Sequence, residues 1–113
     1  MIKIYHNNRC SKSRCALKLL EESKKPFEVI NYLEDIPSAK ELAHIIKLLQ
    51  IKPIELVRKN EAIWKENFKN KTLSDEELID IMVKNPKLIE RPIVINGKNA
   101  VIGRPTERVL EII

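Results

Sequence analysis

Cys10 is the residue of this sequence best placed to act as a nucleophile. It follows a short stretch of alternating apolar and polar residues, 2–6, and it directly precedes a predicted helix over about residues 11–23. Free backbone N–H groups and the positive dipole end at a helix start lower a thiol pKa and can also hold an oxyanion. Neighbouring residues add positive charge and hydroxyl donors: Arg9, Lys12, Arg14, Ser11 and Ser13. The pattern predicts a reactive thiolate beside a small anion site; the alternative is an unreactive, half-buried cysteine.

Cys15, the second of the two cysteines, does not complete a redox pair by spacing. If both residues are helical, their Cα atoms lie roughly 8.7 Å apart, beyond the limit of about 7 Å for a disulfide. The resolving position of a C-x-x-C motif is occupied by Ser13. We therefore predict that Cys15 lies on the core face of the helix, because free cysteines are often buried. In the alternative, local unwinding lets Cys15 resolve an adduct formed on Cys10.

The elements that must position Cys10 form a strand–helix–strand unit. Residues 2–6 alternate as a first strand, the helix of residues 11–23 has a broad apolar face, and Pro26 opens a second short strand over 27–31. This length suits a right-handed crossover that joins two parallel strands.

The rest of the chain predicts a helical insertion followed by a hairpin. Capping boxes at Ser38 and Ser74 begin helices over about 38–50 and 74–84, with one further helix around Trp64. Asn96-Gly97, between β-branched runs, predicts a hairpin, and Pro105 begins a closing helix to about residue 112. The order βαβ, insertion, ββα predicts an α/β fold with a thioredoxin-like mixed sheet. We expect a single domain over residues 1–113, with the helical insertion at about 34–88.

Composition and charge narrow the classes of function. The 113 residues are 43% hydrophobic and 33% charged, so the chain can bury a core. The net charge of +5 is concentrated at the two ends, since residues 34–90 hold ten basic and eleven acidic side chains. No apolar run exceeds three residues, so we expect no membrane partner, no signal peptide and a cytoplasmic protein with reduced thiols. Two cysteines and two scattered histidines lack the spacing of a zinc site.

Four motifs in register resemble the glutaredoxin-coupled arsenate reductase family. They are His6-Asn-Asn-Arg-Cys10-Ser-Lys-Ser-Arg14, Leu56-Val-Arg58-Lys-Asn60, Glu90-Arg91-Pro92-Ile-Val94, and Gly103-Arg104-Pro105 through Val109-Leu110. A single cysteine after a strand is weak evidence, whereas four motifs in order over nearly the whole chain are specific. Asn8 stands where the family usually has proline, which could loosen the loop before Cys10.

The resemblance implies an activity and a set of partners. Cys10 would attack arsenate to form a covalent thiol-arsenate adduct, and reduced glutathione and glutaredoxin would supply the electrons that release arsenite. No bound cofactor is expected, because glutathione acts as a co-substrate. The implied role is in arsenic resistance.

The resemblance also implies site residues. Arg58, Arg91 and Arg104 would hold the oxyanion, which suits the planar, permanently charged guanidinium group better than an ammonium group. Ser11 and Ser13 would add hydroxyl donors. His6 would favour the thiolate, and the Arg91–Pro92 peptide bond would be cis, facing the reactive cysteine.

Three other functions are alternatives to this one. A glutathione-linked thiol oxidoreductase of unknown substrate remains open, because nothing in the sequence excludes it. An Spx-like regulatory protein shares the fold, but its redox switch resembles C-x-x-C and Ser13 removes that motif. A phosphatase-like C-x5-R loop would need arginine at position 16, which is Ala16. Nucleic acid is not expected as a partner, because the basic residues cluster near the proposed site and only five aromatic residues are available for stacking.

Overall fold

A computed structural model describes residues 1–113, and the chain divides into two compact units. The first unit consists of residues 1–35 and 91–113, and the second of residues 36–90. The sequence placed the helical insertion at about 34–88. No helix has both the length and the apolar composition needed to cross a bilayer.

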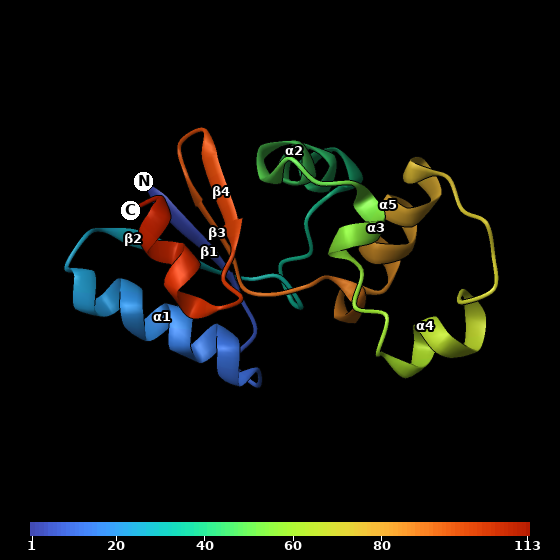
Figure 1. Ribbon diagram of the computed structural model, residues 1–113, viewed down its shortest axis with the longest axis horizontal. Helices are drawn as coiled ribbons and strands as arrows, with labels where there is room; N and C mark the ends of the chain where they lie inside the picture. Colours follow the sequence, from blue (N-terminus) through green and yellow to red (C-terminus); the bar gives the residue numbers. More distant parts are fainter. The chain divides into compact units, whose positions relative to one another are not determined.

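The first unit is a four-stranded mixed sheet with helices (Figure 1). Its elements are β1 (Ile2–His6), α1 (Ser11–Ser23), β2 (Phe27–Asn31), β3 (Ile93–Asn96), β4 (Asn99–Ile102) and the 3-10 helix η2 (Thr106–Glu111). The strand order is β2-β1-β3-β4, in which β1 and β2 are parallel and the other neighbours are antiparallel. The predicted α/β class and the βαβ…ββα order are therefore confirmed.

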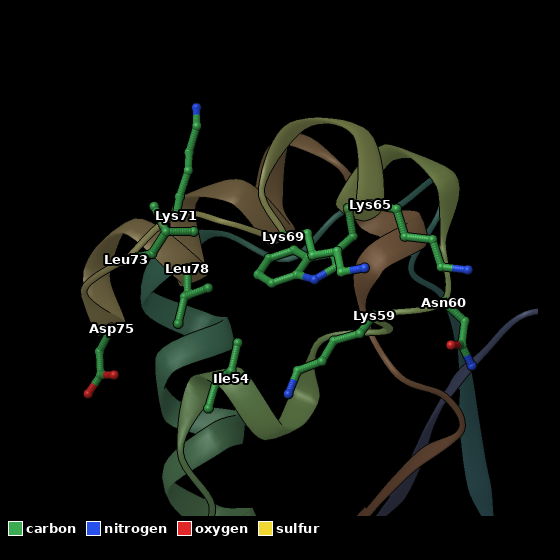
Figure 2. A pocket seen from close by; sticks show the side chains of 10 residues that line it. Ile54, Lys59, Asn60, Lys65, Lys69, Lys71, Leu73, Asp75 and Leu78 are labelled. Atoms are coloured by element: carbon green, nitrogen blue, oxygen red, sulfur yellow. The ribbon is translucent and has the colours of Figure 1, made fainter.

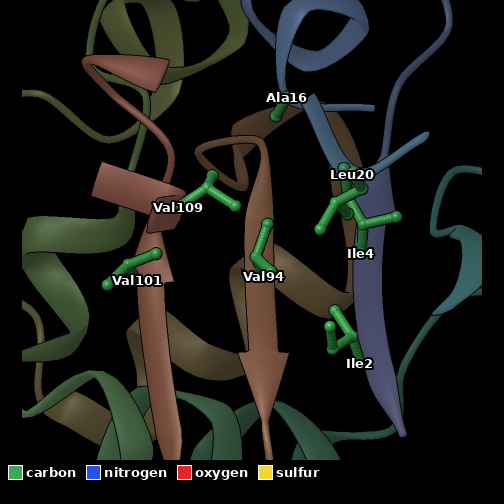
Figure 3. Close-up of a cluster of buried hydrophobic side chains, with 7 residues drawn as sticks. All are labelled: Ile2, Ile4, Ala16, Leu20, Val94, Val101 and Val109. Carbon is green, nitrogen blue, oxygen red and sulfur yellow. The ribbon is translucent and has the colours of Figure 1, made fainter. Parts of the chain in front are cut away.

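One face of the sheet carries the core of this unit (Figure 3). Alternating residues on β1 point to this face, and α1 and η2 cover it with apolar side chains. The cluster consists of Ile2, Ile4, Ala16, Leu20, Val94, Val101 and Val109. Because Ala16 and Leu20 are four residues apart, they lie on the same side of α1 and hold that helix against the sheet.

Cys15 is exposed, so the prediction that it lies on the core face is wrong. The buried residues of α1 are Ser13, Ala16 and Leu20, which fall on one side of the helix. Cys15 immediately precedes Ala16, and one residue turns an α-helix by about 100°. Cys15 therefore falls outside the buried side of α1, and the polar Ser13 is part of that side.

The C-terminal part of the first unit differs from the prediction in two details. The hairpin turn is Gly97-Lys98 rather than Asn96-Gly97, because Asn96 pairs with Asn99 in the sheet. Gly97 has a φ of 62°, which a glycine adopts without a steric penalty. The closing element is the 3-10 helix η2, and Pro105 comes just before it rather than opening an α-helix.

The second unit contains the helices α2 (Ala39–Leu49), α3 (Pro53–Leu56), α4 (Ala62–Asn67) and α5 (Asp75–Lys84) and the 3-10 turn η1 (Pro86–Leu88). The hydroxyls of Ser38 and Ser74 accept hydrogen bonds from the backbone amides of Glu41 and Glu77, as the sequence predicted. The Glu77 carboxylate also accepts from the Ser74 amide, which completes a capping box. These caps fix where α2 and α5 begin.

Gly103 gives the first prediction, because it lies between β4 and Arg104 with no space for a side chain. A Cβ at this position would lie 2.9 Å from Cγ of Pro92 and 3.3 Å from Cγ2 of Val109. Gly103→Ala is therefore expected to lower the free energy of unfolding by about 1–3 kcal/mol, measured by urea denaturation. Gly97→Asn is the control, since a Cβ at position 97 would meet no atoms within 4 Å and asparagine tolerates positive φ. Equal stability of the two variants would contradict the prediction.

Candidate active site

Cys10 occupies the N-cap position of α1, at the end of the loop that follows β1. Its amide donates a hydrogen bond of 3.0 Å to the Asn7 carbonyl, and its own carbonyl accepts one of 3.0 Å from the Arg14 amide. Its backbone is extended, with φ −95° and ψ 122°, and its side chain is partly exposed. The thiol is therefore held at the helix start but remains accessible.

The surroundings of the Cys10 sulfur stabilise the thiolate. Burial raises the pKa of the thiol, but three neighbouring groups lower it by more. They are the backbone amide of Ser13, the side chain of Arg91 and the backbone amide of Lys12. Because these groups hydrogen-bond to or attract the charged sulfur, the net pKa of Cys10 lies below that of an ordinary thiol.

The sheet register brings Arg91 and Arg104 to the edge that carries Cys10. Ile93 pairs with Ile102 and with Tyr5, so the residues before β3 and after β4 lie beside the carboxyl end of β1. The Gly103 amide donates to the Pro92 carbonyl at 2.9 Å and extends the pairing by one step. Residues far apart in the sequence thus meet at one end of the hairpin.

The guanidinium group of Arg104 hydrogen-bonds to both Cys10 and Arg91. Its Nη2 donates to Sγ of Cys10 at 3.3 Å, while its Nε donates to the Arg91 carbonyl at 2.7 Å. The peptide bond between Arg91 and Pro92 is cis, as the resemblance implied. The Arg104–Pro105 bond is also cis, which the sequence did not indicate.

His6 lies behind the cysteine loop, where it contacts Ser13 and Asn8. Its Nδ1 is 2.6 Å from Ser13 Oγ, and its Nε2 is 3.4 Å from Asn8 Oδ1. Ser13 Oγ also accepts a hydrogen bond of 3.0 Å from the Asn7 amide. One ring nitrogen therefore contacts α1 at Ser13 and the other contacts the loop at Asn8, and neither contacts the Cys10 sulfur.

One of the two predicted serine ligands, Ser13, differs from expectation. The Ser13 side chain is completely buried and bonded to His6 and to the Asn7 amide, so its hydroxyl does not face a ligand. What Ser13 offers the sulfur is its backbone amide. Ser11 is exposed at the first position of α1.

Arg58 lies in the second unit, after α3. Its guanidinium group forms ion pairs with Glu61 and Glu90, each at 3.7 Å. A backbone bridge between Val57 and Ile89 and a hydrogen bond from the Arg58 amide to the Leu88 carbonyl fix the adjacent chain. The cysteine site of the first unit thus consists of Cys10, Arg91, Arg104 and the amides at the start of α1.

The two asparagines before Cys10 hold the loop through hydrogen bonds that the sequence did not indicate. Asn7 is buried and uses three groups: its amide donates to Ser13, its carbonyl accepts from Cys10, and its Oδ1 accepts from the Arg9 amide at 3.0 Å. The Asn8 carbonyl accepts from Arg14 Nη1 at 3.0 Å. Asparagine commonly forms such local turns, so the Asn-Asn pair after a strand was the available signal.

The lowered pKa of Cys10 gives the second prediction. In a Cys15→Ser background, where Cys10 is the one thiol left, the alkylation rate should rise with the thiolate fraction as pH increases. Its midpoint is expected below that of a small free thiol such as N-acetylcysteine. Arg91→Ala should raise the midpoint, because a hydrogen bond and a positive charge that favour the thiolate are lost.

Lys98→Ala is the control for that experiment, since it removes one positive charge from the exposed hairpin turn. It should leave the midpoint where it is. A wild-type midpoint at or above that of the free thiol would contradict the prediction.

The mixed sheet, with a cysteine at the N-cap of α1, places the chain among thioredoxin-like proteins. Within that class, the model of the ArsC family matches residues 5–112, and the chain belongs to the ArsC family.

Several relatives match almost the whole chain. The uncharacterized protein YfgD of Escherichia coli is 50% identical over 114 residues, covering 99% of this chain and 96% of that protein. An arsenate reductase of Haemophilus influenzae is 45% identical over 112 residues, covering 97% of each chain. The solved structure of an arsenate reductase from Vibrio cholerae superimposes with a TM-score of 0.94 at 45% identity, covering 99% of this chain and 97% of that one.

Proposed function

We propose that this protein is an arsenate reductase in which Cys10 is the nucleophile. The observation that carries the proposal is the Cys10 sulfur at the start of α1, which accepts a hydrogen bond from Arg104. Its pKa is lowered by the neighbouring Arg91 side chain and by backbone amides. Such a site places a soft nucleophile beside hydrogen-bond donors that can bind a tetrahedral oxyanion. The relatives from Haemophilus influenzae and Neisseria meningitidis that carry the name arsenate reductase support it.

In the first step, the Cys10 thiolate attacks the arsenic of arsenate. A sulfur–arsenic bond forms, and one arsenate oxygen takes up protons and leaves as water. Arg91, Arg104 and the amides at the start of α1 neutralise the negative charge of the remaining oxygens. Arg58 is proposed as the third arginine, and His6 acts as a positioning residue that orients Ser13.

The second step transfers two electrons to arsenic. A glutathione thiolate attacks the Cys10 sulfur, and the electron pair of the sulfur–arsenic bond stays with arsenic, which leaves as arsenite. Cys10 is then in a mixed disulfide with glutathione. Glutaredoxin reduces that disulfide by thiol–disulfide exchange and restores the Cys10 thiolate. This chemistry requires a reducing compartment that contains glutathione, which fits the cytoplasm.

A coupled assay tests the proposal directly. The purified protein is mixed with arsenate, reduced glutathione, glutaredoxin, glutathione reductase and NADPH, and the oxidation of NADPH is followed. We expect oxidation that depends on both arsenate and glutaredoxin. Equal oxidation of NADPH with and without arsenate would contradict the proposal, and phosphate is the control anion because it has the same shape but is not reduced.

A further inference from the structure

The second unit contains a cavity of about 620 Å³ that the proposed reaction does not use (Figure 2). It is formed by α4, the chain on either side of it, and residues of α3 and α5. The volume lies within the range of about 300–1,000 Å³ that is usual for small-molecule sites. All of its lining residues belong to the second unit.

Positive charge is concentrated around this cavity. Its lining includes four lysines and one carboxylate, that of Asp75; the lysines are Lys59, Lys65, Lys69 and Lys71. None of these lysines takes part in the ion pairs of the chain, which join Arg58 to Glu61 and Glu90, and Lys84 to Asp80. The combined positive charge of these side chains would attract a small anion to the cavity.

The apolar part of the lining comes from Trp64 together with Ile54, Leu73 and Leu78. Trp64 packs against Phe68 with ring centroids 5.8 Å apart, and Nζ of Lys71 lies 5.8 Å from the centre of the Phe68 ring. In Figure 2, the Lys59 side chain extends into the cavity, whereas Lys71 points away from it. A ligand in the cavity would thus meet an apolar surface with an aromatic ring and ammonium groups at its edge.

We propose that this cavity binds a small organic anion that combines a planar ring with phosphate groups, as a nucleotide does. The ring would pack on the apolar lining beside Trp64, and the phosphates would lie beside Lys59 and Lys69, which bind them as point charges. We expect the ring alone or the phosphates alone to bind more weakly than the two together. Because the lysines are exposed, binding should weaken as salt is added.

The experiment uses ATP as the probe and the emission of Trp64 as the readout. Trp64 is the one tryptophan of the chain, so its emission reports on this cavity without interference. Isothermal titration calorimetry measures the same affinity independently. We expect ATP to change the emission and to bind more tightly than tripolyphosphate, which lacks the ring, or adenosine, which lacks the charge.

Variants then locate the site. The double variant Lys59→Ala/Lys69→Ala should weaken ATP binding by up to about twenty-five-fold, since each lost exposed ion pair contributes up to about fivefold. Lys40→Ala/Lys47→Ala removes two exposed lysines from α2 in the same unit and should leave the affinity unchanged. Circular dichroism checks that both variants are folded.

Four results would overturn the proposal: no binding of ATP, tripolyphosphate binding as tightly as ATP, adenosine binding as tightly as ATP, or equal weakening by the two double variants. The assay of arsenate reduction tests Cys10 in the first unit, so failure of that function is recognised separately.

Discussion

The Cys10→Ser variant is expected to lose at least about a thousandfold of its arsenate-dependent turnover, an effect of the size seen when a covalent nucleophile is removed. A serine hydroxyl is not ionised near neutral pH, so the amides of Ser13 and Lys12 and the Arg91 side chain would have no anionic nucleophile to stabilise. A serine oxygen also cannot form the mixed disulfide from which glutathione and glutaredoxin regenerate the protein. The measurement is the glutaredoxin-coupled oxidation of NADPH at saturating arsenate.

Cys15→Ser is the matched control for this prediction. Cys15 is exposed on α1 and lies outside the buried face that contains Ser13 and Ala16. Its replacement should therefore leave turnover at the wild-type rate. Loss of turnover in Cys15→Ser would revive the alternative in which Cys15 resolves the adduct on Cys10. Full turnover in Cys10→Ser would refute the proposed nucleophile.

The Arg104→Ala variant is expected to weaken the productive binding of arsenate by about ten- to a hundredfold, since a lost charged hydrogen bond costs about 1.5–3 kcal/mol. Arg104 donates from Nη2 to the Cys10 sulfur and from Nε to the Arg91 carbonyl, so one side chain serves both the nucleophile and the neighbouring arginine. The change should appear in kcat/KM for arsenate.

Two further variants separate the charge of Arg104 from its shape. Arg104→Lys keeps the positive charge but has one nitrogen, which cannot reach both Cys10 and Arg91 as the guanidinium group does. We expect an activity between those of the wild type and Arg104→Ala. Arg108→Ala removes an exposed arginine from η2 and should have no effect on kcat/KM. An equal loss of kcat/KM in Arg104→Ala and Arg108→Ala would indicate an effect of net charge, and no loss in either would refute the role of Arg104.

The sequence predicted most of the fold because its signals were local. The alternation of residues 2–6 matches β1, and the capping residues Ser38 and Ser74 precede α2 and α5 as expected. These signals depend on neighbours within a few residues, where backbone amides and side chains satisfy one another. The hairpin turn was displaced by one residue, because strand pairing rather than the Asn-Gly dipeptide fixed its position.

The sequence predicted less well which residues near the site are buried. Apolar patterning assigned Cys15 to the core, but Cys15 is exposed, and the buried side of α1 includes the polar Ser13. A buried hydroxyl is tolerated because His6 and the amide of Asn7 satisfy its hydrogen bonds. Both partners come from the end of β1 and the loop after it, so their effect on Ser13 appears only when the chain is folded.

The sequence by itself determined the local chemistry of this protein: a cysteine at a helix start, where free amides favour an anion. Only the tertiary structure decided which other groups reach that sulfur. Arg91 and Arg104 are more than 80 residues from Cys10 in the chain, and they meet it because the antiparallel pairing of β3 with β1 and β4 ends at the same edge. Backbone hydrogen bonds across a sheet join distant segments in a fixed register, and no local sequence pattern specifies that register alone.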